Sequence, residues 1–137
     1  MLMAQSTLTG KSIFINLNQE QTSTTDGLEI EYGVLTGLTM TDDPNSPFNM
    51  GSIECRTISL IEDSRSIPLS CNVCSVSDKD GDVFMYYSEV GFEAKYLVRL
   101  IPGTGKYKNL SGDGTASAVG GTQDGKSVFT WELTYKM

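Results

Sequence analysis

The chain has 137 residues, 39% of them hydrophobic, and its 10 basic and 17 acidic residues give a formal net charge of −7. This length suits a single domain, 1–137, that can bury about two-thirds of the surface of its unfolded chain without help from a metal. We expect residues 1–10 to form a flexible N-terminal segment. The acidic balance argues against a nucleic-acid partner and against binding to an anionic membrane surface.

The chain contains no histidine. This excludes serine–histidine and cysteine–histidine nucleophile pairs, histidine-ligated zinc or iron, and an imidazole pH switch. Any acid–base chemistry falls to Asp, Glu, Tyr, Lys or Cys, and we expect no cofactor and no metal. Residues 1–6 lack the basic and apolar segments of a signal peptide. No apolar run reaches the roughly 20 residues of a membrane-spanning helix.

The predicted elements are all strands, because apolar and polar residues alternate with period two and Thr, Ser, Val, Ile and Tyr are frequent. In chain order, the strand-like runs are Lys11–Leu17, Leu28–Tyr32, Gly51–Ile61, Ile67–Ser77, Val83–Val90, Ala94–Ile101, Gly112–Val119 and Lys126–Lys136. Asp-Gly pairs, typical of tight hairpin turns, occur at residues 26–27, 80–81, 113–114 and 124–125.

About eight short strands joined by hairpins predict an antiparallel meander. Closing the sheet removes its two exposed edges, and a barrel of about eight strands has an interior just wide enough for side chains or one small ligand. We therefore predict an all-β fold with a single closed antiparallel β-barrel, and a two-sheet sandwich is the alternative. The polar segment 41–48, with Pro44 and Pro47, either covers one barrel mouth or is an ordinary surface connection.

Two stretches resemble known motifs but fail on spacing. Residues 103–106 read Gly-Thr-Gly-Lys, but Tyr107 follows where a phosphate-binding loop needs Ser or Thr, and the upstream glycine is missing. A glycine bend at a barrel corner explains them better. Residues 78–82 resemble a calcium loop, but their glycine stands at the fourth position instead of the sixth. We interpret them as the acidic tip of a hairpin.

Three cysteines, Cys55, Cys71 and Cys74, allow at most one intramolecular bridge. Cys71 and Cys74 have the CxxC spacing, but residues three apart in a strand point to opposite faces. A redox or zinc role is therefore disfavoured, since two cysteines alone do not complete a zinc site.

Apolar stripes on the strands predict a shared interior. Ile13, Ile15 and Leu17 form one stripe, and residues 129, 131, 133 and 135 form an aromatic-rich second one. Aromatic side chains there would line a pocket, with tyrosines as polar groups. The candidate ligand-binding residues are Tyr86, Tyr96, Tyr107, Phe129, Trp131 and Glu132.

Charged residues within the runs raise the opposite question. If Glu29 and Glu31, or Glu132, pointed inward, a carboxylate would lie in a confined interior, where desolvation raises its pKa. We prefer the interpretation that these charges, and Arg99, face water. Glu132 remains a candidate for the inward case only.

Five segments also carry a family resemblance. They are the cysteine run Ile53–Cys55, the run Cys74–Asp82 with its acidic turn, Gly103–Tyr107, Gly112–Thr115 and the tryptophan run Thr130–Leu133. Their order resembles the small bacterial β-barrel proteins of the allene oxide cyclase barrel-like, or calycin-like, group. The resemblance covers about residues 27–137, and 103–114 is its most specific part.

The resemblance implies a lipocalin-like or allene-oxide-cyclase-like barrel with a mostly apolar interior. It also implies a Cys55–Cys74 bridge that leaves Cys71 free, and hence an oxidising compartment. An exported protein, periplasmic or secreted, is expected if the bridge forms, and a cytoplasmic one otherwise. Enzymes of the wider group cyclise reactive apolar substrates by shaping their bound conformation. None of their catalytic residues matches a position of this chain.

Three functional hypotheses follow. The first is a barrel that binds an apolar small molecule in its interior. The second is a cyclase or isomerase in which Glu or Tyr polarises a carbonyl or epoxide oxygen. The third is a filled, ligand-free barrel that serves as an exported structural or interaction protein. The sequence leaves the formation of homo-oligomers open.

Overall fold

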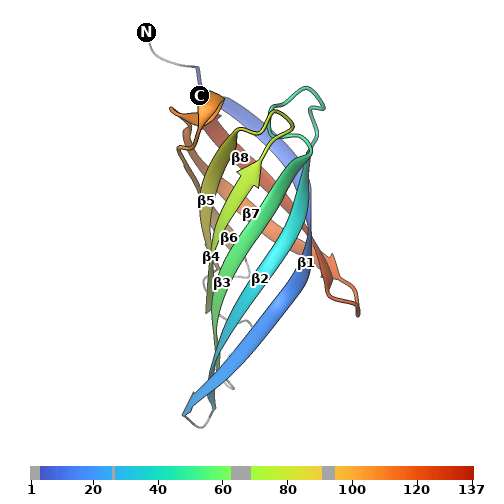
Figure 1. Cartoon of the computed structure of the whole chain (residues 1–137), viewed down its shortest axis with the longest axis vertical. Coiled ribbons are helices and arrows are strands. Elements are labelled where there is room, and N and C mark those ends of the chain that lie inside the picture. The colour runs from blue at the N-terminus through green and yellow to red at the C-terminus, as the bar shows by residue number, and fades with distance from the viewer. Residues whose placement is uncertain (1–3, 26, 63–68, 91–94) are drawn as a thin grey trace.

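The structure is a computed structural model that describes residues 4–25, 27–62, 69–90 and 95–137. Eight antiparallel strands form one closed barrel in chain order, with the first strand paired to the last (Figure 1). The strands are β1 (Ser6–Thr25), β2 (Leu28–Thr41), β3 (Gly51–Glu62), β4 (Leu69–Ser77), β5 (Val83–Val90), β6 (Lys95–Ile101), β7 (Ser111–Gly121) and β8 (Lys126–Lys136). The predicted barrel is confirmed, and the sandwich alternative is excluded.

Strands β1 and β2 are longer than the sequence predicted. Strand β1 begins at Ser6 and pairs with β8 from there, so residues 6–10 belong to the barrel wall although we expected a flexible segment. The predicted runs at Ile67 and Ala94 begin outside the described residues. No helix in the described ranges is long and apolar enough to cross a membrane.

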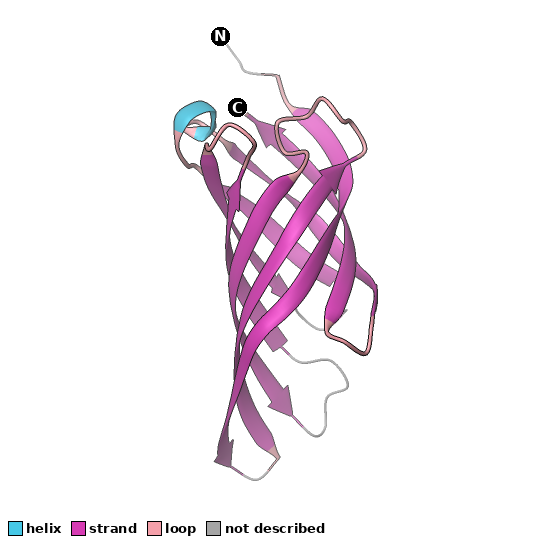
Figure 2. Ribbon diagram, turned by 45° about the vertical axis from the view of Figure 1, so that its right-hand side comes forward, coloured by secondary structure: helices cyan, strands magenta, loops and turns pink. Residues whose placement is uncertain are grey.

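One end of the barrel carries the segment 42–50, the turn 78–82 and the short 3-10 helix η1 (Gly105–Tyr107), as Figure 2 shows. We call it the plugged end, because Phe48 from the longest loop is 2% exposed and packs inside it. The Phe48 ring centroid lies 5.0 Å from that of Phe84, 5.8 Å from that of Tyr107 and 4.9 Å from that of Tyr135. The segment 41–48 therefore covers a barrel mouth. The opposite end, with the β1–β2 connection, is the hairpin end.

Glycines allow η1 to pack against the β4–β5 turn. A Cβ atom on Gly103 would lie closer than 3.0 Å to the carbonyl oxygen of Val83, a distance that real Cβ atoms essentially never show. Gly105 has a φ of 54°, in the left-handed region that favours glycine. The interpretation of this stretch as a glycine bend is confirmed.

The outward face of β1 corrects one prediction. Ile13, Ile15 and Leu17, which we expected in the interior, are 36%, 40% and 61% exposed. Ser12 and Phe14 are buried instead, so the other face of the strand points inward. The second predicted stripe is confirmed, because Phe129, Trp131, Leu133 and Tyr135 all belong to the core or pack against it.

The bulk of Trp131 explains why the apolar stripe of β1 lies on the outer face of the barrel. Gly10 pairs with Trp131 in the β1–β8 register, and a Cβ on Gly10 would lie closer than 3.0 Å to the indole ring. The indole thus covers an inward position that cannot hold a side chain. The inner face of β1 therefore has small residues at Gly10 and Ser12, and its outer face looks more hydrophobic in the sequence.

Candidate ligand cavity

The barrel interior contains a partly open cavity of about 120 Å³. All eight strands and the loop residue Phe48 contribute to its lining, and no described Asp, Glu, Lys or Arg side chain is among the lining residues. The lining is mostly apolar. An ion entering it would lose its hydration without gaining an opposite charge, so the cavity favours neutral molecules.

Aromatic rings form one wall of the cavity. Phe14 and Tyr96 both meet Phe129 edge to face, with ring centroids 5.7 Å and 5.5 Å apart. Trp131 lines the cavity beside them. Edge-to-face packing fixes the ring orientations, so this wall presents rigid apolar surface to a ligand.

Most polar groups of the cavity are already paired. The Trp131 indole N–H donates to Ser12 Oγ at 3.1 Å, and the Ser12 hydroxyl donates to Thr39 Oγ1 at 3.1 Å. On another wall, the Asn72 side-chain amide donates to Ser88 Oγ at 2.9 Å. These bonds satisfy donors that would otherwise be costly to bury.

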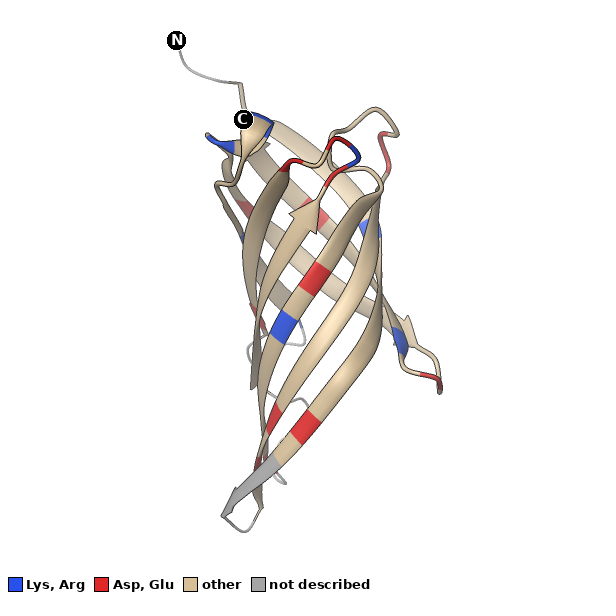
Figure 3. Ribbon diagram, viewed as in Figure 1, with Lys and Arg blue, Asp and Glu red and all other residues tan. Residues whose placement is uncertain are grey.

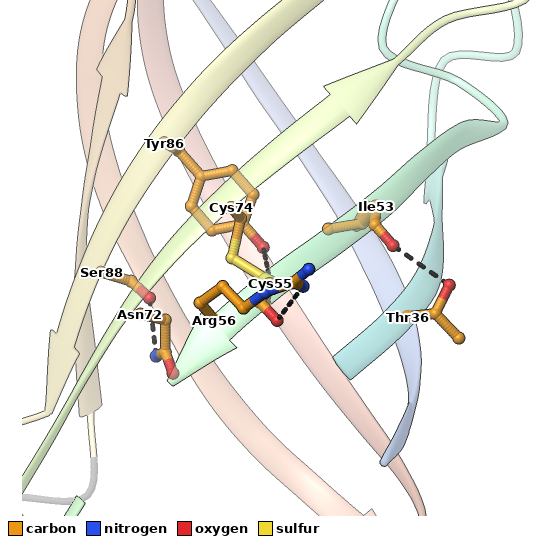
Figure 4. Close-up of a disulfide and its surroundings, with 8 residues drawn as sticks. All are labelled: Thr36, Ile53, Cys55, Arg56, Asn72, Cys74, Tyr86 and Ser88. Carbon is orange, nitrogen blue, oxygen red and sulfur yellow. Dashed lines mark hydrogen bonds between the residues drawn. A yellow bond between two sulfur atoms is a disulfide. The ribbon is translucent and has the colours of Figure 1, made fainter. Parts of the chain in front are cut away.

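A disulfide forms part of the wall. Cys55 on β3 and Cys74 on β4 are directly paired in the register, with Cα atoms 4.1 Å apart, and their sulfurs are bonded (Figure 4). They are 3% and 1% exposed, and both line the cavity. The bridge predicted from the resemblance is confirmed. Cys71 is a free, half-buried thiol, and its spacing from Cys74 places it on the opposite face of β4.

Tyr86 on β5 points across β4 towards this disulfide (Figure 4). Its hydroxyl oxygen lies 3.8 Å from Cys55 Sγ, a weak acceptor. Burial raises the pKa of the Tyr86 phenol above its ordinary value. The group is therefore a neutral O–H at physiological pH and can only act as a hydrogen-bond donor or a weak acceptor.

Of the six predicted ligand residues, four line the cavity and two do not. Tyr86, Tyr96, Phe129 and Trp131 line the cavity. Tyr107 is fully buried in the plugged end and is not among the lining residues. Glu132 is exposed on the outer face of β8, so the inward case we kept for it does not hold. A ligand-binding role for the four lining residues remains a prediction.

The other charged residues of the predicted strands differ in their exposure. Arg99 is exposed, as expected. Glu29 and Glu31 are half-buried and occupy the same alternate positions of β2 as Leu35, a cavity-lining residue. The expectation that they face water stays a prediction for these two residues. Both lie towards the hairpin end and do not line the cavity, and Gln21 on β1 donates to the Glu31 carboxylate at 3.1 Å.

Sequence reasoning missed several lining residues, among them Asn72 and Ser88. The alternation of inward and outward side chains along a strand would have indicated both residues. Asn72 stands two positions before Cys74 on β4, and Ser88 stands two positions after Tyr86 on β5. Each therefore shares the inward face with a residue that was singled out.

The acidic turn holds the plug in place. The Tyr107 hydroxyl shares its single hydrogen between Asp78 Oδ2 at 2.8 Å and the Pro47 carbonyl oxygen at 3.1 Å. The backbone N–H groups of Asp80 and Asp82 donate to Asp78 Oδ1 at 2.8 Å and 3.0 Å. Burial alone would raise the pKa of Asp78, but its bonds to Lys106, to Tyr107 and to these backbone groups lower it to about 2.

Lys106 on η1 forms ion pairs with the carboxylates of the turn 78–82, where charged residues gather in Figure 3. Its ammonium nitrogen lies 2.7 Å from Asp78, 2.8 Å from Asp80 and 3.9 Å from Asp82. In the described part of the chain, no group of three or more His, Cys, Asp and Glu side chains is arranged to hold a metal ion. The interpretation of residues 78–82 as a hairpin tip is confirmed.

Comparisons with known proteins show the fold. No family model matches the chain, and no curated protein matches its sequence. Among solved structures, the chain is similar to the pterocarpan synthase dirigent protein GePTS1, with a TM-score of 0.64 and 10% identity over 96% of this chain and 89% of that one. It is also similar to the pterocarpan synthase dirigent protein PsPTS1, with a TM-score of 0.62 and 9% identity over 99% and 97%. The eight-strand barrel is therefore shared with dirigent proteins.

Proposed function

We propose that the barrel binds a small, neutral, largely apolar molecule in its interior cavity. The observation that carries this proposal is the cavity itself, about 120 Å³ of uncharged, mostly apolar space with a wall of fixed aromatic rings. A hydrocarbon-lined cavity of about 150 Å³ in another protein binds benzene, so a space of this size suits a molecule built on a single ring.

A cavity-filling substitution tests this proposal. Ala116 lines the cavity, whereas the next residue, Ser117, is exposed on the same strand. The variant A116L should abolish binding of methylenecyclohexane, a neutral six-membered ring, and S117L should bind it as the wild type does. A binder gains thermal stability from its ligand, by about 2.7 kcal/mol at a ligand concentration of 100 Kd. Equal stabilisation of A116L and S117L, or none of the wild type, would refute the proposal.

A templating enzyme is the second candidate, favoured by the likeness to dirigent proteins described as pterocarpan synthases. The described lining offers Tyr86 and Tyr96 but no carboxylate, so the residues support catalysis by orientation and hydrogen bonding only. Membership of the allene oxide cyclase barrel-like group also remains a proposal. The templating hypothesis would be tested by conversion of a reactive apolar substrate to a single stereoisomer, with A116L as the inactive control.

The disulfide supports an exported protein, because bridges persist in oxidising compartments. The interaction-protein hypothesis is supported by exposed apolar side chains on the outer face, such as Leu17, Leu97 and Val119. The open interior favours ligand binding over that hypothesis, since a ligand-free structural barrel has no need of unfilled space. Native mass spectrometry of protein from its own source would distinguish them by a co-purifying small molecule.

A further inference from the structure

Tyr86 lines the cavity with its hydroxyl hydrogen bond made only to a weak acceptor. It lies midway along the barrel, paired in the register with Cys74 on one side and Leu100 on the other. Its hydroxyl contacts the bridged sulfur of Cys55 at 3.8 Å, and no oxygen or nitrogen partner for it is found among the described residues. A bridged sulfur carries no hydrogen, so the phenol is the donor in this weak contact.

Tyr107 shows what a satisfied buried tyrosine looks like in the same barrel. Its hydroxyl has two oxygen partners, Asp78 and the Pro47 carbonyl, at 2.8 Å and 3.1 Å. Trp131, Ser12 and Thr39 are linked by hydrogen bonds, and Asn72 is bonded to Ser88. Among the described lining residues, Tyr96 is the other tyrosine, and its hydroxyl has no hydrogen-bond partner. Both tyrosines of the lining therefore have donor capacity left, and Tyr86 is the one whose hydroxyl lies inside the barrel wall, against the buried sulfur of Cys55.

The surroundings of Tyr86 limit what that ligand can be. A carboxylate or a phosphate would be buried without a cation, because no described Lys or Arg lines the cavity. An ammonium group would meet the same difficulty, because no described Asp or Glu lines it. A neutral acceptor oxygen remains, and a carbonyl oxygen accepts from a phenol without needing a donor in return.

We propose that the Tyr86 hydroxyl selects a neutral, ring-sized ligand that carries a carbonyl oxygen, which accepts its hydrogen bond in place of the Cys55 sulfur. This inference rests on the proposed function, since it concerns the same cavity. Tyr86 is then a specificity-determining residue, and the aromatic wall of Phe14, Tyr96 and Phe129 holds the ring.

Two ligands of nearly equal shape test it. Cyclohexanone and methylenecyclohexane share a ring and differ in one group, a carbonyl oxygen against a methylene. Their Kd values are measured by NMR titration for the wild type, Y86F, Y96F and the outer-face control Y87F. Comparison across variants cancels the different hydration of the two ligands, because hydration in free solution is the same for every variant.

Y86F should weaken cyclohexanone binding about tenfold, the effect of losing one hydrogen bond worth about 1.4 kcal/mol. Methylenecyclohexane should bind Y86F and the wild type within about twofold. Y87F, which removes a hydroxyl from the outer face of the same strand, should leave both Kd values unchanged. If the other tyrosine of the lining supplied the donor, Y96F and not Y86F would lose the preference for the ketone. The near-UV circular dichroism of Trp131 reports whether each variant retains its packed interior.

The outcomes separate the two proposals. If neither ligand binds the folded wild type, the cavity proposal fails and this inference fails with it. If both bind but Y86F leaves the cyclohexanone Kd unchanged, the cavity proposal stands and the role of Tyr86 is refuted. Loss of the ketone preference in Y96F instead of Y86F would also overturn the assignment, because the donor would then be the wrong tyrosine.

Discussion

Removal of the Cys55–Cys74 bridge should destabilise the barrel by an amount that its position predicts. The bridge closes a segment with a sequence separation of 19. The loss of chain entropy in the unfolded state for a loop of this length is worth about 3 kcal/mol. For a domain of this size, about 3–4 °C per kcal/mol converts that loss to a fall in Tm of about 10 °C.

The assay is thermal and urea unfolding of the double variant C55A/C74A, with C71A as the matched control. Cys71 has no bridge to lose and is half-buried, so C71A should lie within about 0.5 kcal/mol of the wild type. Reduced wild-type protein should show the same loss as the double variant without any sulfur being removed. Thiol counting on unreduced protein should find one thiol, Cys71.

Two results would refute the reasoning. Three titratable thiols in unreduced, denatured protein would mean that no bridge forms. A Tm of C55A/C74A equal to that of the oxidised wild type would mean that the bridge adds nothing to stability. The first result would also remove the argument for an oxidising compartment.

Three further changes test the plug and the packing against β8. The pKa of Asp78 is about 2 in the folded state and about 3.9 in the unfolded state, so this carboxylate stabilises the fold above pH 4 and the stabilisation is lost as the pH falls towards 2. In acid titrations followed by circular dichroism, D78N should flatten that part of the stability profile. Y107F should cost about 1–3 kcal/mol in urea unfolding, since it leaves buried Asp78 without its phenol donor, whereas Y87F on the outer face should cost less than about 0.5 kcal/mol; equal losses would contradict the plug. G10A should destabilise by about 2 kcal/mol or more in the same assay, because its Cβ collides with Trp131, and G120A, whose Cβ meets nothing within 4 Å, should be neutral; a stable G10A would contradict the packing.

The strands and turns were largely predictable because local sequence encodes them. Gly27, Gly81 and Gly125, each the second residue of an Asp-Gly pair, have φ values of 79°, 84° and 86° at hairpin turns. The fourth pair misleads, because Gly114 lies inside β7. A Cβ there would lie closer than 3.0 Å to the Glu132 carbonyl oxygen, so this glycine serves a close approach of strands instead of a turn.

The inward face of each strand was harder to predict, since it depends on partners far away in sequence. The small residues at Gly10 and Ser12 make sense only once Trp131 is known to lie over them. The same applies to Phe48, whose burial requires Phe84, Tyr107 and Tyr135 around it. A period of two gives the alternation but not its direction, because a shift of one residue exchanges the faces.

The candidate site was predictable only in part, because the alternation of side chains does not tell which face points inward. Tyr86, Tyr96, Phe129 and Trp131 were predicted from aromatic residues in strand-like runs, and the structure brings all four to one cavity. Tyr107 follows the glycine bend and is carried into the plug instead. Glu132 alternates with Trp131 and Leu133 on β8, so the inward face of its neighbours requires that it face outward.

The most direct test of the central claim is where a bound ring lies. Intermolecular nuclear Overhauser effects from methylenecyclohexane should reach the Ala116 methyl group and the Phe129 ring, both of which line the cavity. They should be absent at Leu97 and Val119, which are 59% and 64% exposed on the outer surface. Contacts to these outer residues, with none to Ala116 or Phe129, would contradict the account of an interior binding site.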